Sequence, residues 1–231
     1  MNTPYKRRFG DRKEGRRLRT LSPFYAITPY IMKERVDASN YFCESIELSA
    51  AEAYIKKKRA DGFKSFGMLH LFVAAYVRTV SQRPALNRFV SGRRIYARHK
   101  IEVVMTIKKK LSSNSGETSF KVLFDPTDTA NEVYERMNAA IAKIKADDGS
   151  NKTENTAKLL MKLPRFLLRF AVCFINWMDF HGICPQKLLE ASPFHGSLVI
   201  TDLGSLSIQP IYHHLYNFGN IPIFLAFGAK R

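Results

Sequence analysis

Residues 197–208 read S-L-V-I-T-D-L-G-S-L-S-I, and they decide the fold class that the sequence predicts. The first half, residues 198–202, is apolar and β-branched, which is typical of a strand, and residues 203–209 form a Gly/Ser turn. A continuous apolar run follows at residues 221–228, and such a run predicts a strand that is covered on both faces. This end of the chain is therefore expected to supply strands to a sheet.

Upstream of this stretch, helical and strand patterns alternate. The clearest helix ends at Pro84, and its apolar stripe recurs at steps of three and four residues through Phe66, Leu69, Val73, Tyr76, Val77 and Val80. Residues 129–145 return to the helical period. Strands are predicted at residues 94–96, 101–107 and 120–124, with a turn cluster at residues 112–116. This mixture predicts an α/β fold, a mixed β-sheet with helices packed on it.

The N-terminal third of the chain has weaker patterns. Residues 22–30 are aromatic and contain two prolines, so we expect an extended segment or one short helical turn. Residues 41–48 alternate imperfectly between apolar and polar, and we interpret them as a strand. Ser49 suits the N-cap of a helix over residues 50–59, where Glu52 would complete a capping box.

Residues 159–180 are the most apolar stretch of the sequence. Three cations and Pro164 interrupt it, and its longest run without a charge, residues 170–178, is about half of what a bilayer crossing needs. We therefore do not interpret it as transmembrane. The prediction is a buried helical pair, and the alternative is an amphipathic helix that lies on a membrane or on a partner.

The composition is that of one globular domain. The chain has 231 residues, of which 45% are hydrophobic and 12% aromatic, so it can bury a large core without metal or disulfide support. Cys43, Cys173 and Cys184 are odd in number and lack metal-ligand spacing, which favours neither a disulfide framework nor a zinc site. Residues 1–20 are basic and polar, unlike a secretory signal peptide. We expect a reducing, cytoplasmic location.

The charge of the chain favours an anionic partner. The formal net charge is +17, and residues 1–20 contain eight of the cations. Nucleic acid, an acidic membrane surface and a polyphosphate such as coenzyme A would each complement this charge. The alternative is a solvated, partly disordered basic arm that binds nothing specific. No nucleic-acid motif is present, and the aromatic residues are spaced as core residues, which makes nucleic acid the least favoured partner.

Two blocks of sequence resemble one protein family when they are considered together. Residues 83–89, R-P-A-L-N-R-F, and residues 92–103, G-R-R-I-Y-A-R-H-K-I-E-V, resemble the helix, "P-x-L-N" turn, hairpin and strand of the acyltransferase component of 2-oxo acid dehydrogenase complexes. Residues 197–208 resemble the "F-T-I-S-N-L-G-x-x-G" segment of that family. Residues 221–228, I-P-I-F-L-A-F-G, resemble its "A-I-L-A-I-G" strand. The resemblance extends to chloramphenicol acetyltransferase, which has the same fold.

This resemblance implies an architecture and a chemistry. The fold would be a two-layer α/β sandwich in which helices cover a mixed β-sheet, and three subunits would form a homotrimer with active sites between neighbours. An acyl group would pass between coenzyme A, bound as a substrate, and a thiol or small-molecule acceptor. The resemblance places the hydroxyl that stabilises the tetrahedral oxyanion on Thr201, and it implies no metal ion. Without the resemblance, Thr201 would be interpreted as an ordinary β-branched strand residue.

The catalytic base of that family is missing from this sequence. The family has it in an H-x-x-x-D-G motif, and none of the six histidines here has an aspartate four places on. His213 and His214 lie near the signature turn, where they are either a substitute base or a surface and packing feature. In the family this motif lies some thirty or more residues beyond the "A-I-L-A-I-G" strand, whereas the sequence here stops at Arg231. We therefore expect either a C-terminally truncated form of an active enzyme or a divergent chain that keeps the scaffold and has lost the base. Since general-base catalysis contributes about 100- to 10,000-fold, a chain without a base would be a poor enzyme.

The domain organisation that we expect is a basic N-terminal arm at residues 1–20 followed by an acyltransferase-like domain at residues 21–231. No lipoyl domain, and so no covalent lipoyl group, is expected on this chain, which favours a free-standing acyltransferase. The alternative is a catalytically inactive trimeric scaffold or regulatory protein of the same fold. A third hypothesis is electrostatic binding to nucleic acid or to an acidic membrane through the basic arm and residues 159–180.

Overall fold

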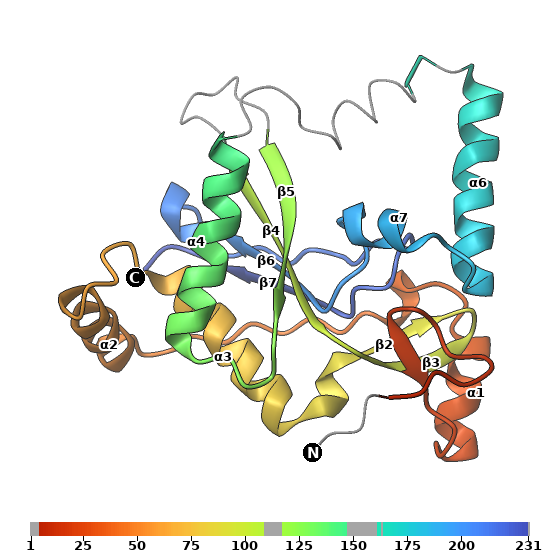
Figure 1. The fold of residues 1–231 in the computed structure, drawn as a ribbon, viewed down its shortest axis with the longest axis horizontal. Coiled ribbons are helices and arrows are strands. Elements are labelled where there is room, and N and C mark those ends of the chain that lie inside the picture. The colour runs from red at the N-terminus through yellow and green to blue at the C-terminus, as the bar shows by residue number, and fades with distance from the viewer. Residues whose placement is uncertain (1–4, 109–116, 147–160, 163, 231) are drawn as a thin grey trace.

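A four-stranded mixed sheet forms the centre of the molecule. The computed structural model describes residues 5–108, 117–146, 161–162 and 164–230. Within them, the sheet has the order β5-β4-β6-β7, with β5 at Glu117–Phe124, β4 at Ile101–Lys108, β6 at Leu198–Asp202 and β7 at Ile223–Phe227 (Figure 1). β4 is antiparallel to β5 and parallel to β6, and β6 is parallel to β7. The predicted α/β class, with helices on a mixed sheet, is confirmed.

One face of this sheet carries the hydrophobic core. The register places Val103 beside Leu198 and Met105 beside Ile200, and because side chains alternate along a strand, these four share a face. Helices α3 (Met68–Gln82) and α4 (Ala130–Ala146) pack on it. Fully buried members of the core include Val73, Val77, Val103, Val133, Met137, Leu198 and Ile200. Each such side chain stabilises the fold by about 1.5–3 kcal/mol when it is removed from water. The contact of the two predicted helices with the sheet is therefore stabilised by this core.

The opposite face of the sheet has no covering helix of comparable length among the described residues. On this face, Lys121 Nζ of β5 donates to the Leu189 carbonyl of helix α7 (Gln186–Ala191) at 2.8 Å. Between the short helix η3 (Gly204–Leu206) and β7, the chain returns across this face, and His213 stacks on Phe224 of β7. Strand β7 is half-buried throughout and pairs only with β6 in the described part of the chain. The predicted cover on both faces is therefore partial: Phe72 stacks on Phe227 on the core face, and His213 stacks on Phe224 on the other.

A smaller antiparallel sheet holds part of the basic N-terminal segment. Its order is β1-β3-β2, with β1 at Gly15–Arg17, β3 at Arg94–Arg98 and β2 at Arg88–Ser91. Gly15 packs so closely that a Cβ atom would lie 2.7 Å from both the Ala97 carbonyl oxygen and the Phe89 ring. Arg12 is only 3% exposed. Residues 11–17 therefore belong to the folded body, and the solvated-arm interpretation does not hold for them.

Two local predictions in the N-terminal third need correction. Residues 41–48 form no strand, because none of the described strands pairs with them and both sides of their pattern mix apolar with polar side chains. Residues 22–30 form more than one turn, since helix α1 runs from Pro23 to Ile31 with a proline in its first turn, where the missing N–H costs nothing. A further 3-10 turn, η1, follows at Val36–Ala38.

The predicted capping box is also absent from helix α2 (Ser49–Ala60). Ser49 is the first helical residue instead of the N-cap, and its hydroxyl donates to the carboxylate of Glu47. Glu52 pairs with Lys230. Helix α3 ends at Gln82 and is followed by the 3-10 turn η2 at Pro84–Asn87, as the proline predicted. The predicted turn at residues 112–116 lies outside the described residues.

Residues 165–181 form one helix, α6 (Arg165–His181), and this helix is not a buried pair. It stands at one side of the molecule (Figure 1). Phe166 is 71% exposed, Phe170 is 68% exposed and Trp177 is 50% exposed, so the prediction of a buried pair was wrong for the described part of the stretch. The pattern failed because it counts apolar residues without showing what covers them. No helix in the described ranges has both the length and the hydropathy that a bilayer crossing requires.

Candidate functional site

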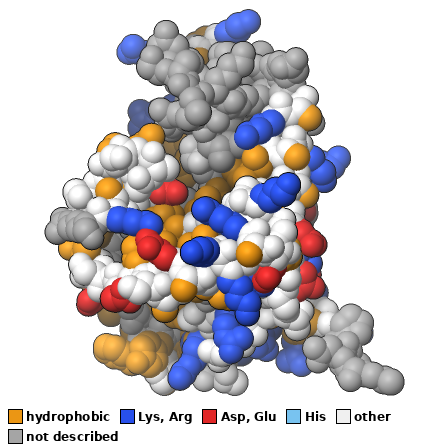
Figure 2. Space-filling model, turned by 90° about the vertical axis from the view of Figure 1, so that its left-hand side faces the viewer, with side chains coloured by type: hydrophobic (Ala, Val, Ile, Leu, Met, Phe, Trp, Pro, Cys, Tyr) orange, Lys and Arg blue, Asp and Glu red, His pale blue; other side chains and the backbone are white. Residues whose placement is uncertain are grey.

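A cleft of about 790 Å³ runs along the parallel strands β4 and β6, from Phe194 and Ile221, which precede β6 and β7, to Thr201 near the carboxyl end of β6. Ligands of α/β sheets commonly bind outside the carboxyl ends of the strands. Figure 2 shows the side of the molecule where the C-terminal end of the described chain lies; hydrophobic side chains gather in the middle of this face, and Lys and Arg side chains stand around them. The cleft is lined by side chains of both sheet faces and of the segment before β7, among them Val104, Val199, Leu215, Tyr216 and Phe224.

Thr201, the residue on which the resemblance placed the oxyanion donor, lines this cleft and is half-buried. It lies on the face of the sheet opposite the core, beside Ala226 of β7. Thr106 of β4 and Ser119 of β5 also line the cleft, and their hydroxyl oxygens are 3.1 Å apart. Hydroxyls from three adjacent strands thus face the cleft.

The hydroxyl of Thr201 differs from its neighbours because it has no hydrogen-bond partner among the described residues. A hydroxyl carries one donor and two acceptor positions, and it rotates to suit its partner. Thr201 can therefore donate to an oxygen atom of a molecule bound in the cleft without first breaking a described protein hydrogen bond.

His213 and His214 are brought to the same cleft as Thr201. The His213 ring stacks on Phe224 with a centroid separation of 4.3 Å, and Phe224 is beside Val199 on the sheet face that carries Thr201. Nδ1 of His213 contacts the His214 carbonyl oxygen at 2.7 Å. The stacking is consistent with the packing interpretation of this histidine, while its position in the cleft leaves the substitute-base interpretation open.

Two cations border the cleft, Arg35 and Lys145. Burial lowers the pKa of Arg35 to about 10, and the nearby charge of Arg98 acts in the same direction. The Arg35 guanidinium still carries its charge at neutral pH and donates to the carbonyl of Ile221. Lys145 is exposed near the end of α4. A cleft with apolar walls and cations at its border suits a ligand that has both an apolar part and an anionic part.

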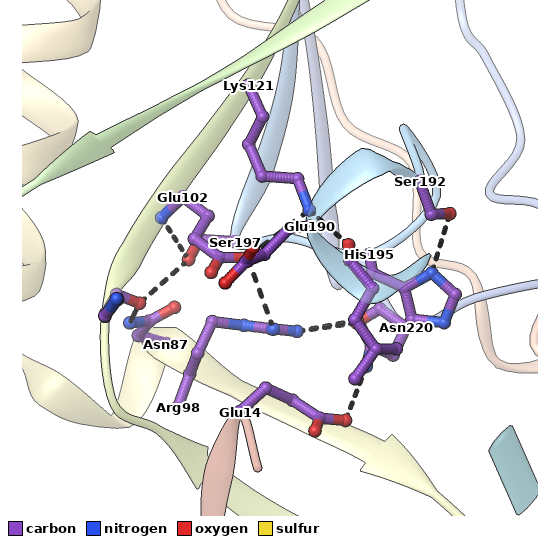
Figure 3. A network of polar contacts seen from close by, with 12 residues as sticks. Glu14, Asn87, Arg98, Glu102, Lys121, Glu190, Ser192, His195, Ser197 and Asn220 are labelled. Atoms are coloured by element: carbon purple, nitrogen blue, oxygen red, sulfur yellow. Dashed lines mark hydrogen bonds and ion pairs between the residues drawn. The ribbon is translucent and has the colours of Figure 1, made fainter. Parts of the chain in front are cut away.

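A buried polar network supports the strands that carry the cleft (Figure 3). Arg98 Nη2 donates to Asn220 Oδ1 at 2.7 Å, and Arg98 Nη1 lies 3.8 Å from Glu102 Oε2. Lys121 Nζ lies 3.6 Å from the same Glu102 oxygen. Burial lowers the pKa of both Arg98 and Lys121, and the Glu102 carboxylate opposes this shift. Removing one member of this network would leave an uncompensated buried charge at the start of β4.

Ser197 extends the network to β6. Its Oγ accepts a hydrogen bond from the Glu102 backbone N–H at 2.9 Å, and it donates to the carbonyl of Lys100 at 3.4 Å. Asn87 Nδ2 donates to the same carbonyl at 2.9 Å. Strands β4 and β6 are therefore fixed to one another just before the segment that ends at Thr201.

A second buried cluster connects the N-terminal segment to helix α6. Arg12 Nη2 donates to both the side chain and the carbonyl of Asp179, and Arg12 Nε is 2.8 Å from Glu14 Oε1. His195 Nε2 is 3.6 Å from Asp179 Oδ1, and its Nδ1 lies 2.8 Å from Ser192 Oγ. The sequence interpretation missed this cluster. Its one signal was Asp179, the single acidic residue in the apolar stretch at residues 159–180.

Among the residues that the structure describes, no group of three or more His, Cys, Asp or Glu side chains could hold a metal ion. Cys43 and Cys173 are exposed free thiols, and Cys184 is a buried one whose pKa is raised by burial. Comparison with models of known protein families gives no match for this chain, and a search among curated proteins gives none.

Proposed function

We propose that the chain is a coenzyme A-dependent acyltransferase with the fold and chemistry of chloramphenicol acetyltransferase and of the 2-oxo acid dehydrogenase acyltransferases. One observation carries this proposal: the hydroxyl of Thr201, which has no hydrogen-bond partner in the described part of the chain, lines a cleft near the carboxyl end of β6. The resemblance of residues 197–208 to the family segment assigns an oxyanion donor to that same residue. The two arguments are independent, since one rests on sequence pattern and the other on position in the fold.

The chemistry needs two contributions from the protein. When an acceptor thiol or hydroxyl attacks the thioester carbonyl, the carbonyl oxygen gains negative charge, and the Thr201 hydroxyl would donate to it. A preorganised donor of this kind contributes about 100- to 1,000-fold to the rate. The acceptor must also lose a proton, and we assign this role to the imidazole of His213, which lines the same cleft. The tetrahedral intermediate then expels coenzyme A as the thiolate or, once protonated, as the thiol.

The cleft supports coenzyme A as the substrate. The acyl chain and pantetheine arm of coenzyme A are compatible with the apolar walls, and Arg35 and Lys145 would pair with its phosphates. The two-layer sandwich and the homotrimer belong to the same proposal. The sheet face that carries Thr201 has no large covering helix in the described chain, so a neighbouring subunit would complete the channel.

The alternative, a catalytically inactive scaffold, is favoured by one observation, the stacking of the His213 ring on Phe224, which suits a packing histidine. The two functions differ in what they predict for a bound thioester. An enzyme transfers the acyl group, and a scaffold binds coenzyme A without turnover or does not bind it.

Thermal unfolding in the presence of acetyl-CoA tests the binding part of the proposal. A ligand at 100 times its dissociation constant stabilises the folded state by about 2.7 kcal/mol, which gives a clear rise in the melting temperature. Lys145→Gln should reduce the rise, because Lys145 borders the cleft. Lys143→Gln is the matched control, since Lys143 is an exposed residue of the same helix outside the cleft lining. A melting temperature that does not respond to millimolar acetyl-CoA would contradict the proposal.

A further inference from the structure

The outward face of helix α6 is an aromatic surface that the described chain does not cover. Phe166, Phe170, Phe174 and Trp177 recur at steps of four and three residues, so they lie on one side of the helix. Their rings follow one another, with centroid separations of 6.2 Å between Phe170 and Phe174 and 6.0 Å between Phe174 and Trp177. All four are exposed. A contiguous apolar surface of this kind marks an interaction site.

The exposed charged residues that the structure describes between positions 161 and 181 all have one sign. Lys162, Arg165 and Arg169 are exposed at the start of the helix and along one side of it. The acidic residue of the helix, Asp179, is buried against Arg12 and so is not part of the surface charge. The helix therefore presents aromatic side chains bordered by cations alone.

The turn between β2 and β3 connects helix α1 to helix α6, and α1 has exposed apolar side chains of its own. Helix α1 contains no charged residue, and Phe24, Tyr25 and Ile31 are exposed on it. The turn contacts both helices, since Arg93 Nη1 donates to the Pro29 carbonyl of α1 at 2.9 Å and Gly92 packs against the Phe180 carbonyl of α6. Both helices lie on the same side of the molecule (Figure 1).

The aromatic face is held in place by the body of the protein. The Arg12 pair with Asp179 fixes the last turns of α6, and Gly182, with φ +75°, ends the helix beside the Arg12 side chain. The exposed aromatic residues are therefore on an anchored helix and not on a frayed chain end.

We propose that this surface, α6 together with α1, docks on an anionic lipid membrane, with the aromatic rings at the interface and the arginines at the lipid phosphates. Interfacial helices have this combination of Phe and Trp on one side and Lys and Arg beside them. A second copy of the chain is the weaker candidate. A two-fold contact of this face with itself would offer its cations no carboxylate from the helix, because Asp179 is buried and already paired with Arg12. The phosphates of an anionic membrane would neutralise these cations.

The single tryptophan of the chain makes the proposal testable without a label. Trp177 is half exposed, so its fluorescence should shift to shorter wavelength when vesicles of phosphatidylcholine and phosphatidylglycerol are added. Brominated lipid in those vesicles should quench it, and pure phosphatidylcholine vesicles should bind more weakly. An emission spectrum that does not change with anionic vesicles would overturn the proposal.

Substitution of basic residues tests which face of the protein contacts the membrane. Each basic residue near an anionic surface contributes about a factor of five, so Arg165→Gln with Arg169→Gln should weaken vesicle binding about 25-fold. Lys56→Gln with Lys57→Gln is the matched control, because these exposed residues lie on α2 at the opposite side of the molecule (Figure 1). Equal losses in both pairs would overturn the proposal and indicate non-specific attraction. Sedimentation without lipid should show that Phe170→Ser leaves the assembly state unchanged; a change would assign the face to a second copy instead.

Discussion

Replacing Arg12 by Met removes the cation of the buried cluster that connects the N-terminal segment to α6. The Arg12 side chain is 3% exposed and its partner Asp179 is 12% exposed, so neither charge is compensated by water. Arg12 also donates to Glu14 and to the Asp179 carbonyl, and these acceptors lose their donor as well. Breaking a buried pair by removing one partner costs about 3–5 kcal/mol. We expect a loss of that size in the free energy of unfolding.

Urea unfolding at pH 7, followed by far-ultraviolet circular dichroism, measures this loss. The control is Lys230→Met, which removes an exposed pair: the Lys230 side chain is 63% exposed and that of its partner Glu52 is 50% exposed. Exposed pairs contribute about 0–1 kcal/mol. If Arg12→Met costs no more than Lys230→Met, the reasoning about burial is refuted.

The pH dependence of this cluster has a defined sign. Burial would raise the pKa of Asp179, but the contact with His195 and the charge of Arg12 outweigh it, and the pKa is lowered. A carboxyl whose pKa is lowered by folding contributes stability that is complete above the ordinary value of 3.8 and is lost as the pH falls through the folded value. Asp179→Asn should therefore reduce the acid dependence of stability below about pH 4.

Two further predictions concern the scaffold. Gly219→Ala should lower the free energy of unfolding by more than the ~1–3 kcal/mol of a strained backbone, because Gly219 has φ +86° and a Cβ there would overlap the Phe194 carbonyl. The control is Gly62→Ala. Gly62 has φ +103° but open space around it, so this variant should cost the backbone strain alone in the same urea assay. Burial lowers the pKa of His70 from 6.5 to about 4. Between these two pH values the unfolded chain binds a proton at His70 and the folded chain does not, so the free energy of unfolding falls as the pH falls across this window. His70→Leu should flatten this fall, and an unchanged slope would refute the assignment.

The elements with a clear period were predictable because one physical requirement, a single buried face, determines them. The apolar stripe from Phe66 to Val80 correctly predicted helix α3, and the β-branched run at residues 101–107 correctly predicted β4, since both have an apolar side that must be buried. Thr201 lies near the end of β6 and lines a cleft, and its assignment as the oxyanion donor stays a prediction.

The rest depended on tertiary contacts that a pattern does not contain. Arg12 appeared as one of eight cations in a basic segment, and its burial depends on Asp179, 167 positions away. Residues 41–48 alternate like a strand, yet no described strand pairs with them. The apolar residues of α6 predicted burial, but burial requires a covering surface, and within the described chain that helix has none on its aromatic side.

The turnover of acetyl-CoA by the Thr201→Val variant tests the central claim most directly. Valine keeps the shape of the side chain and removes the hydroxyl, so transfer of the acetyl group to a small dithiol such as dihydrolipoamide should fall about 100- to 1,000-fold in kcat. The thermal stabilisation by acetyl-CoA should persist, and Thr201→Ser should retain most of the rate. Equal turnover by the wild type and Thr201→Val, or no turnover by the wild type, would contradict the assignment of Thr201 as the oxyanion donor.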